Sequence, residues 1–487
     1  MAYRIDDNAR PLLDEAARRD FQTFVILGWP GVNGGNLLEW NWHHAALVQH
    51  LEDVRAGKTQ RLLVNLPPRS AKSILISVLW VAWMLGQDPT LNFVCVSYSS
   101  ELANKLARMC LEVMQSPLHR RLFPQTKIKR TRTAAYDFET TRGGGRLATS
   151  PGGTLTGRGG DILILDDPTK PADAMSDVLR SSAIDWYRST LLSRLNDKRT
   201  GVIICVQQRL HEEDLSGVIL EAGGWVEFCL PAIATDDQTV PLTRGKTHFR
   251  KAGELLHPER ESQAILDQLK ADMGSIAFEA QYQQNPLPLA GNLFKSEWLE
   301  TYTERPERGE IVQSYDTASK TGLNNDFSAC VTALIVGDDI YIIDVYRKRL
   351  EFPDLVAKVN QLAIRHNANV LLIEDAASGT QLFQTLKGKR EPGVPLPKKC
   401  TASTDKATRA SGVSSMVESG RVLFPMEAPW LEDFKRELLS FPSGKHDDQV
   451  DAFTQLLEWV RDRYRGRVRT KYRSKLVVIN HGDDPWE

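Results

Sequence analysis

Short apolar runs separated by longer segments of helical periodicity mark the first half of the chain. The runs contain few polar residues, which is typical of strands buried on both faces of a parallel sheet. Strands that alternate with helices in this way favour an α/β domain with helices on both faces of the sheet. The predicted strands are "RLLVNL" (61–66), "NFVCVS" (92–97), "DILILD" (161–166) and "GVIICV" (201–206).

The second half of the chain has a different order of elements. Three strand-like runs follow one another, and the tight turn "GDD" joins the last two, which predicts an antiparallel meander before a parallel strand. Helices near 404–419, 429–440 and 447–464, with the short strand "RVLF" (421–424), complete the pattern. The meander and the parallel strand are "IVQSYD" (311–316), "SACVTALIV" (328–336), "IYIIDVY" (340–346) and, after a helix near 353–366, "NVLLIED" (369–375).

Two linker-like stretches, "NPLPLAGN" (285–292) and "ERPERGE" (304–310), separate these halves. A chain of 487 residues is also too long for one ordinary core. We therefore predict a division into a first domain over residues 1–285, a linker over 286–310, a second domain over 311–460 and a tail over 461–487.

The composition, 41% apolar and 25% charged, is that of a globular protein. The longest apolar stretch, from Ile74 to Leu85, is too short to span a bilayer, so we expect no association with membranes. Six cysteines without a CxxC pair indicate neither a zinc site nor a disulfide framework, which favours a cytosolic protein.

The net charge of the chain is −1, but its charges are unevenly distributed. A basic segment lies near the C-terminus, "RDRYRGRVRTKYRSK" (461–475). Eight basic residues occupy every second position, and an extended chain would place them all on one face. Such a face is consistent with a solvated surface or with contact to nucleic-acid phosphate or an acidic partner.

The stretch "LPPRSAKS" (66–73) lies between the first predicted strand and a helical segment. A phosphate-binding loop needs curled backbone amides, a lysine to neutralise phosphate and a hydroxyl for Mg²⁺, and Lys72 and Ser73 supply the last two. Glycine is preferred in such loops because their curvature requires positive φ, yet Ala71 stands here. Taken alone, the stretch fits an ordinary strand-turn-helix connection equally well.

A second motif favours the nucleotide interpretation. The run "DILILDDP" (161–168) ends a buried strand in two carboxylates. Asp166 is placed to hold Mg²⁺ through water and Asp167 to orient the attacking water. The sequence Asp-Asp-Pro is also common in turns that end strands, but two such motifs on separate strands favour a nucleotide site.

Carboxylates in the second half indicate separate chemistry. Asp316 and Glu374 each end a predicted strand, and Asp448 and Asp451 share one face at the start of a predicted helix. Individually each is a common cap or turn residue, but together they are what a two-metal phosphodiesterase site requires. The order of elements around them resembles that of RNase H-like nucleases. Nearby acids that compete for the assignment are Asp326, Asp375 and Asp447.

The chain resembles the large terminase subunit of tailed bacteriophages, the motor that packages DNA into the capsid. In that family the form Pro-Pro-Arg-x-x-Lys-Ser of the loop is usual, although glycine is usual in place of Ala71. The resemblance runs from about residue 38 to residue 460. It is carried by "WNWHHAALVQHLEDVRAGKTQRLLVNLPPRSAKS" (40–73), "SYSSELANKLAR" (97–108), "GGRLATSPGGTLTGRGGDILILDDP" (144–168) and "HDDQVDAF" (446–453).

The resemblance implies an N-terminal P-loop NTPase domain, a C-terminal RNase H-like nuclease domain, and two enzyme activities. These are ATP hydrolysis coupled to translocation of double-stranded DNA, and metal-dependent cleavage of concatemeric DNA. It implies ATP and Mg²⁺ as cofactors, with Mn²⁺ able to serve the nuclease. The implied partners are double-stranded DNA, the portal protein of the procapsid, a small terminase subunit and further copies of the chain in a ring, all in the host cytoplasm.

The resemblance also implies roles for particular residues. Arg69 or Arg108 is the candidate arginine finger, and Gln207 ends the fourth predicted strand, where such motors sense the γ-phosphate. Trp42, His43 and His44 lie where adenine contacts are expected, although a His-His pair is also typical of helix packing. The nucleotide-binding set is Pro68, Arg69, Ser70, Ala71, Lys72, Ser73, Asp166 and Gln207, with Lys72, Arg69 and Asp167 catalytic. The nuclease set is Asp316, Glu374 and Asp448, with Asp451 as a fourth metal ligand. In the ATPase domain the metal ligands are Ser73 and Asp166.

Two other classes of protein fit parts of this pattern. A DNA helicase or repair nuclease with an ATPase domain would need a second motor lobe, whereas the residues after 310 show an acidic catalytic pattern. A non-catalytic assembly protein with a decayed ATPase fold would not retain Lys72, Ser73, Asp166 and Asp167 together.

Overall fold

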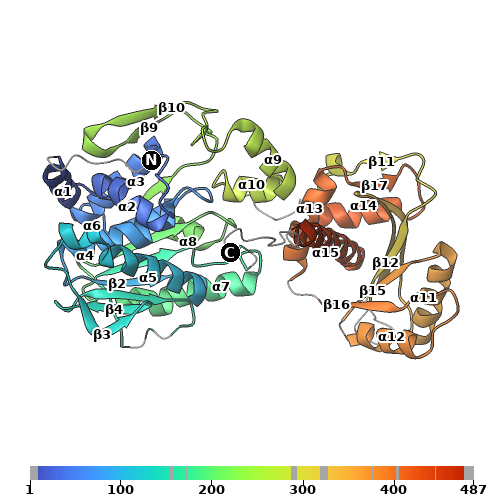
Figure 1. The fold of residues 1–487 in the computed structure, drawn as a ribbon. Helices are drawn as coiled ribbons and strands as arrows, with labels where there is room; N and C mark the ends of the chain where they lie inside the picture. Colours follow the sequence, from blue (N-terminus) through green and yellow to red (C-terminus); the bar gives the residue numbers. More distant parts are fainter. Residues whose placement is uncertain are drawn as a thin grey trace, which may run out of the picture. The chain divides into compact units, whose positions relative to one another are not determined.

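The computed structural model describes residues 9–153, 155, 157–171, 173–286, 293–317, 327–375, 377–401, 405–444 and 446–475. The chain divides into two compact units. Unit 1 comprises residues 1–270 with 275–288, and unit 2 comprises residues 271–274 with 289–487. Each unit is built around one large sheet (Figure 1).

The large sheet of unit 1 has eight strands. They are β1 (Arg61–Asn65), β2 (Asn92–Val96), β3 (Ile128–Ala134), β4 (Asp137–Thr140), β5 (Gly145–Thr149), β6 (Ile162–Asp166), β7 (Val202–Gln207) and β8 (Val226–Cys229). Their order is β3-β4-β5-β2-β6-β7-β1-β8, and the six strands from β5 to β8 run parallel. Strands β3 and β4 add an antiparallel edge. A separate hairpin is formed by β9 (Gln238–Pro241) and β10 (Thr247–Arg250).

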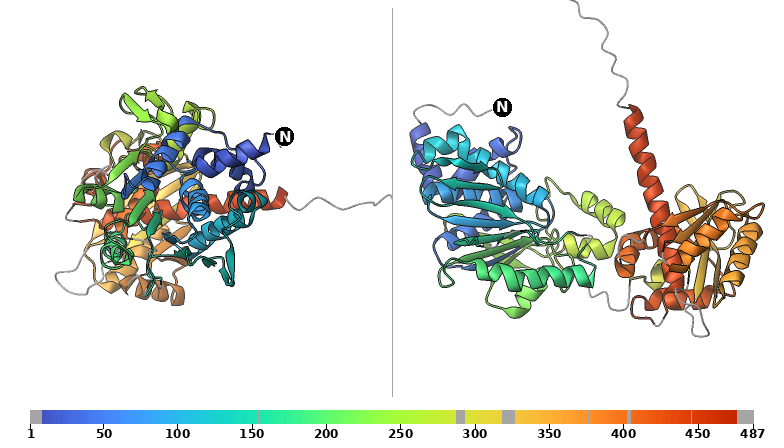
Figure 2. Two further views of the ribbon diagram at one scale, coloured as in Figure 1. Left: turned by 90° about the vertical axis from the view of Figure 1, so that its left-hand side faces the viewer. Right: turned by 90° about the horizontal axis from the view of Figure 1, so that it is seen from below.

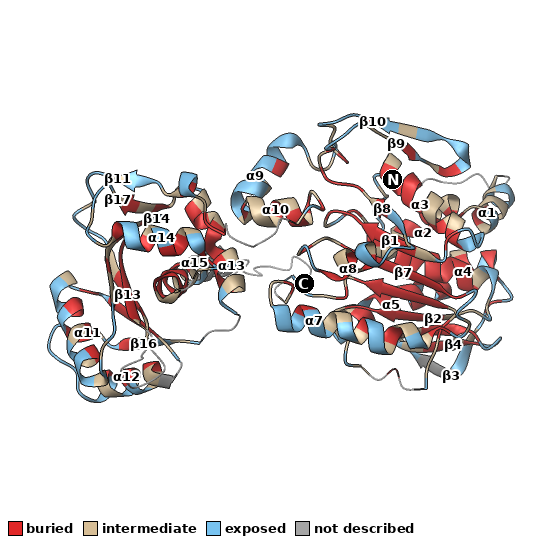
Figure 3. Cartoon of the chain, turned by 180° about the vertical axis from the view of Figure 1, so that it is seen from behind, coloured by how far each residue is buried: buried red, intermediate tan, exposed pale blue. Residues whose placement is uncertain are grey.

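Helices cover both faces of this sheet because successive strand residues point to opposite sides. In β1, Leu62 and Val64 join one apolar core, whereas Leu63 joins the other. Figure 3 shows the buried strands between their covering helices. The first core is covered by α1 (Arg10–Arg19), α2 (Phe21–Val32), α3 (Trp42–Arg55), the π-helical segment Ile74–Trp80, α4 (Val81–Gln87), α5 (Ser100–Gln115) and α6 (Pro117–Leu122). The second is covered by α7 (Asp177–Trp186), the turn after it and α8 (Leu215–Ala222). Helices α9 (Gln263–Met273) and α10 (Ser275–Gln281) follow.

The sheet of unit 2 has seven strands in the order β11-β17-β14-β13-β12-β15-β16. Strands β12, β13 and β14 form the predicted antiparallel meander, and β15 pairs in parallel with β12. The strands are β11 (Thr301–Tyr302), β12 (Glu310–Asp316), β13 (Ser328–Val336), β14 (Asp339–Lys348), β15 (Val370–Glu374), β16 (Pro397–Cys400) and β17 (Val422–Pro425).

Helices also cover both faces of this second sheet. One face packs against α11 (Phe352–His366) and α12 (Ala377–Gly388). The long helix α15 (Asp448–Lys475) contacts β12, β13 and two further helices, α13 (Lys406–Glu418) and α14 (Leu431–Ser440). Figure 2 shows α15 as one continuous helix. Among the described residues, no helix combines the length and the apolar character that a membrane crossing requires.

Two sequence-based predictions need correction. The backbone of residues 461–475 belongs to α15 and is helical, not extended, because Arg and Lys are good helix formers. Every second position of a helix is turned by about 200°, so the alternation of basic residues does not gather them on one face. Part of the expected linker is also folded into unit 2, because Phe294 and Trp298 are buried and Thr301–Tyr302 pairs with β17.

Candidate functional site

The loop between β1 and the π-helical segment has the curvature of a phosphate-binding loop without its glycines. Arg69 and Ala71 both adopt a φ of 64°. This left-handed conformation costs a non-glycine residue about 1–2 kcal/mol, so the surrounding contacts must impose it. One such contact is the hydrogen bond from Ser70 Oγ to the carbonyl of Pro67, at 2.8 Å.

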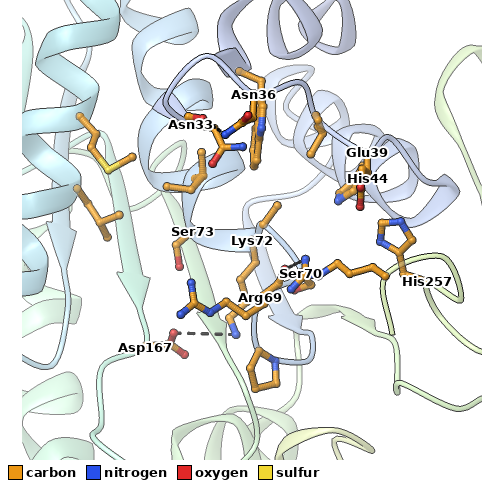
Figure 4. Close-up of a pocket in the computed structure, with 18 of the residues that line it drawn as sticks. Asn33, Asn36, Glu39, His44, Arg69, Ser70, Lys72, Ser73, Asp167 and His257 are labelled. Atoms are coloured by element: carbon orange, nitrogen blue, oxygen red, sulfur yellow. Dashed lines mark hydrogen bonds and ion pairs between the residues drawn. The ribbon is translucent and has the colours of Figure 1, made fainter. Parts of the chain in front are cut away.

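The side chain of Lys72 is buried beneath this loop. Its Nζ donates to the carbonyl of Leu66 at 3.2 Å and lies 4.0 Å from Oδ2 of Asp167 (Figure 4). An ammonium group has three donors, so Lys72 keeps capacity for a further acceptor. A lysine held in this way can neutralise a phosphate bound over the loop.

Asp166 ends β6 directly beside the start of the helix that follows the loop. Oδ1 accepts a hydrogen bond from Ser73 Oγ at 2.7 Å, and Oδ2 accepts one from Ser77 Oγ at 2.5 Å. Burial, reinforced by the charge of Asp167, raises the pKa of Asp166 to about 6. A divalent cation beside Ser73 and Asp166 would favour the ionised carboxylate, because an opposite charge stabilises it.

Asp167 turns away from the strand with a φ of 47° and lines the same space as the loop. Its Oδ1 accepts a hydrogen bond from the backbone N–H of Gln208 at 3.3 Å. Gln207 ends β7 opposite Asn65 of β1, whose side chain donates to its carbonyl at 3.2 Å. The amide Nε2 of Gln207 is buried and has no hydrogen-bond partner in the described part of the chain.

A cavity of about 950 Å³ lies over the loop and is lined by Lys72, Ser73 and Asp167, whereas Asp166 and Gln207 are not among its described lining residues. The loop from Pro68 to Ser73, together with Asp167, forms one wall (Figure 4). Arg69 lines the cavity, whereas Arg108 is exposed on α5 and is not among the described lining residues. Of the two arginines considered from the sequence, Arg69 therefore has access to a bound phosphate.

Of the three residues predicted to contact adenine, Trp42, His43 and His44, only His44 is among the described lining residues of the cavity. His44 lines the cavity, but its Nδ1 accepts a hydrogen bond from the N–H of Asn41 at 3.1 Å and so caps α3. Burial lowers the pKa of His44 to about 3. Trp42 stacks on His248 with ring centroids 4.2 Å apart, and His43 is buried against its neighbouring histidines. His43 therefore serves helix packing, which is the alternative role of a His-His pair.

Further residues line the cavity without any local sequence signal, among them Asn33, Asn36, Glu39, His257 and Arg260. Arg260 donates a hydrogen bond to the carbonyl of Arg69, which belongs to the strained part of the loop. Because these residues lie in connections far from the loop, only the folded chain brings them to it.

In unit 2, strand pairing gathers the predicted carboxylates. Tyr315 of β12 is in register with Ile373 of β15, so Asp316 and Glu374 leave adjacent parallel strands at the same edge. Asp448 begins α15, which packs on β12 and β13. Burial and the nearby carboxylates of Asp451 and Glu374 raise the pKa of Asp316 well above its usual range.

Two cations from α13 lie among these acids. Arg409 contacts Oδ1 of Asp451 at 2.8 Å and Oε1 of Glu374 at 3.3 Å. Lys406 contacts Asp447 at 2.8 Å and also Asp451. Asp451, Asp447 and Glu374 are therefore all engaged in ion pairs. Within the described ranges, no three acidic, histidine or cysteine side chains are placed so that they could hold one metal ion.

Asp375, the neighbour of Glu374, has hydrogen-bond partners of its own. Asp375 accepts from Lys399 at 2.7 Å and from Thr380 at 2.8 Å. Asp326 lies outside the described residues. The chain thus brings Asp316, Glu374, Asp448 and Asp451 to one region, with Lys406 and Arg409 among them.

The chain thus combines two units: an α/β unit with a phosphate-binding type of loop, and a unit whose strand order resembles that of RNase H-like proteins. Each unit carries its own candidate site. Residues 313–458 match the family model described as the terminase RNase H-like domain. The large terminase of the thermophilic bacteriophage D6E aligns with 85% of this chain and 98% of its own, at 12% identity and a TM-score of 0.50. No curated protein sequence matches the chain.

Two further solved structures are similar to a lesser degree. The large terminase of bacteriophage HK97 aligns with 87% of this chain and 95% of its own, at 12% identity and a TM-score of 0.35. The large terminase nuclease of the thermophilic phage G20c, solved with bound magnesium, aligns with 35% of this chain and 98% of its own, at 16% identity and a TM-score of 0.27.

The family match covers most of unit 2 and is to the terminase RNase H-like domain. The alignment with the D6E protein extends the likeness of fold across both units. The predicted fold class and the resemblance to terminase large subunits are thereby confirmed.

Proposed function

We propose that this chain is the large terminase subunit of a phage, a DNA-packaging motor that hydrolyses ATP in unit 1 and cuts DNA in unit 2. The observation that carries the proposal is that Lys72, Ser73 and Asp167 line one cavity, and that Asp166 accepts a hydrogen bond from Ser73, so that two motifs on separate strands meet there. The terminase RNase H-like match of unit 2 supports the second activity.

The residues around the cavity fit ATP and Mg²⁺. Lys72 and the amides of the loop bind phosphate oxygens, and Ser73 and Asp166 would hold Mg²⁺, which neutralises phosphate charge when bound. Asp167 orients the attacking water and accepts its proton. Arg69 stabilises charge that develops on the transferred phosphoryl group. Gln207 ends β7 directly before the cavity-lining Gln208, and we assign it to sensing the γ-phosphate, as the family resemblance implies.

The carboxylates of unit 2 fit divalent cations by their chemistry, because Mg²⁺ and Mn²⁺ prefer oxygen ligands. Asp316, Glu374 and Asp448 would hold the ions, which stabilise the attacking and leaving oxygens of the cleaved phosphodiester. Asp451, the fourth metal ligand expected from the sequence, is also the buried partner of Arg409 and Lys406. We therefore assign it to orienting these two cations within the site.

The partners follow from the family resemblance alone. They are double-stranded DNA, the portal of the procapsid, a small terminase subunit and further copies of this chain in a ring, in the cytoplasm of the host. The test of the proposal is to assay the purified full chain for ATP hydrolysis and, separately, for plasmid nicking in Mn²⁺ without ATP. We expect both activities, and a chain that shows neither would refute the proposal.

A further inference from the structure

Glu437 is a carboxylate buried on the apolar side of α14. Its side chain is 4% exposed, and it lies on the same face of the helix as Phe434 and Leu438, which are fully buried. Burial of an unpaired charge costs several kcal/mol, so a carboxylate in this position requires compensating partners.

The partners of Glu437 are at the start of α15 and at the end of β14. Oε1 accepts hydrogen bonds from the backbone N–H groups of Gln449 at 2.7 Å and Val450 at 3.4 Å. Oε2 accepts from Nε2 of Gln449 at 2.6 Å and from the guanidinium of Arg347. The first N–H groups of a helix have no partner within it, and a negative charge there is favourable. Glu437 thus caps α15 from another helix.

Arg347 connects this cap to the strand that carries Asp316. Asp316 of β12 is in register with Ala329 of β13, and Ala329 is in register with Arg347 of β14. Two strand spacings, about 10 Å, separate Asp316 from Arg347 along this line. The guanidinium is also held by Phe327, whose ring centroid lies 4.6 Å from Cζ. The end of β14 is therefore joined to the first turn of α15 through the side chains of Arg347 and Glu437.

We propose that Glu437 is a positioning residue of the nuclease site, which fixes Asp448 relative to Asp316 by holding the first turn of α15 against Arg347. This inference rests on the proposed nuclease function. Asp448 is the first residue of α15, directly before Gln449, so a rotation of this turn would displace its carboxylate. Displacement of a metal-binding carboxylate weakens metal binding, and loss of such supporting contacts typically costs 10–100-fold in affinity.

Glu437→Gln tests the inference while keeping the size of the side chain. The amide can still accept from one backbone N–H, but it carries no charge for Arg347. The matched control is Glu432→Gln on the same helix, where the carboxylate is 82% exposed. Plasmid nicking by the full chain is measured across a Mn²⁺ titration, with thermal melting and ATP hydrolysis of the same preparations.

For Glu437→Gln we expect the half-saturating Mn²⁺ concentration to rise about tenfold, with substantial recovery of nicking at high Mn²⁺ and unchanged ATP hydrolysis. The control should match wild type. A purely structural cap would lower the melting temperature and leave the metal dependence of the folded protein unchanged, and that result would overturn the inference.

A second variant covers the case in which Glu437→Gln does not melt cooperatively. Arg347→Lys keeps the positive charge but replaces the planar guanidinium that meets both Glu437 and Phe327. A raised Mn²⁺ requirement in this variant supports the inference, and a wild-type requirement refutes it. Wild-type chain that does not nick plasmid at any Mn²⁺ concentration refutes the proposed nuclease function itself, which is a different result.

Discussion

Ser73 Oγ donates a hydrogen bond of 2.7 Å to Oδ1 of Asp166, although 93 positions separate the two residues in the sequence. The contact joins the residue directly before the π-helical segment to the end of β6. In unit 1 this hydrogen bond joins the loop motif (66–73) to the carboxylate motif (161–168), which the sequence alone relates only through their residue types. The nucleotide site therefore rests on an observed contact between side chains.

The first prediction concerns Lys72→Ala. Removing the ammonium group leaves a bound phosphate without its neutralising charge, so ATP hydrolysis should be lost while plasmid nicking remains near wild type. Hydrolysis and nicking are measured on the same preparation. Lys58→Ala, at a side chain 70% exposed, is the control and should behave as wild type. Loss of nicking as complete as the loss of ATP hydrolysis would show that the two sites are not independent.

The second prediction concerns Asp167→Asn. Asparagine tolerates the positive φ of this position, so the loop geometry should persist. It is a poor proton acceptor, and hydrolysis should fall by about 10²-fold or more, as is typical when a general base is removed. Nucleotide binding, measured by fluorescence with a labelled analogue, should change little. Unchanged turnover would assign the base to another residue.

The third prediction concerns Ala71→Gly. A glycine in place of alanine usually destabilises a protein, but Ala71 has a φ of 64°, where glycine is not strained. Thermal melting should therefore show equal or higher stability, and ATP hydrolysis should be retained. Ala107→Gly within α5 is the contrasting control and should cost more than about 1 kcal/mol, because a buried methyl group is lost in addition to helix propensity. A loss of stability in Ala71→Gly as large as in the control would mean that the loop conformation is different.

Much of the fold follows from the apolar runs of the sequence. The four runs predicted for unit 1 and the meander of unit 2 are strands whose ends differ from the prediction by at most two residues. The hairpin of β3 and β4 was not predicted, because these strands are partly exposed and lack a continuous apolar run. The prediction of one basic face after position 460 was wrong, because it requires an extended chain and this segment is helical. Alternation of basic residues does not distinguish a strand from a helix, since Arg and Lys are compatible with both.

The candidate sites were predictable to the extent that their residues lie in motifs. Lys72 and Asp167 carry a local signal, whereas His257 and Arg260 reach the cavity only through folding of distant connections. The role of Glu437 could not be predicted from the sequence either. It depends on partners at the start of α15 and on β14 that only the folded chain brings to this side chain.

The fourth prediction concerns Asp451→Asn. Asp451 is the buried partner of Arg409, whose side chain is 4% exposed. Removing one charge of a buried pair costs about 3–5 kcal/mol, so the melting temperature of unit 2 should fall and cleavage should weaken. Asp433→Asn, in an exposed pair with Arg436, is the control and should melt as wild type. If Asp451→Asn also melts as wild type but no longer cleaves, Asp451 acts as a metal ligand and not as the partner of Arg409.

The most direct test of two separate sites on one chain is Asp316→Asn, assayed for plasmid cleavage across a Mn²⁺ titration and for ATP hydrolysis. Asp316 ends the interior strand β12 among the other carboxylates, where one ligand would serve both ions. We predict that cleavage is abolished at every Mn²⁺ concentration while ATP hydrolysis equals that of wild type. Robust cleavage by Asp316→Asn at ordinary Mn²⁺ would contradict the account, and Asp326 would then be the next candidate.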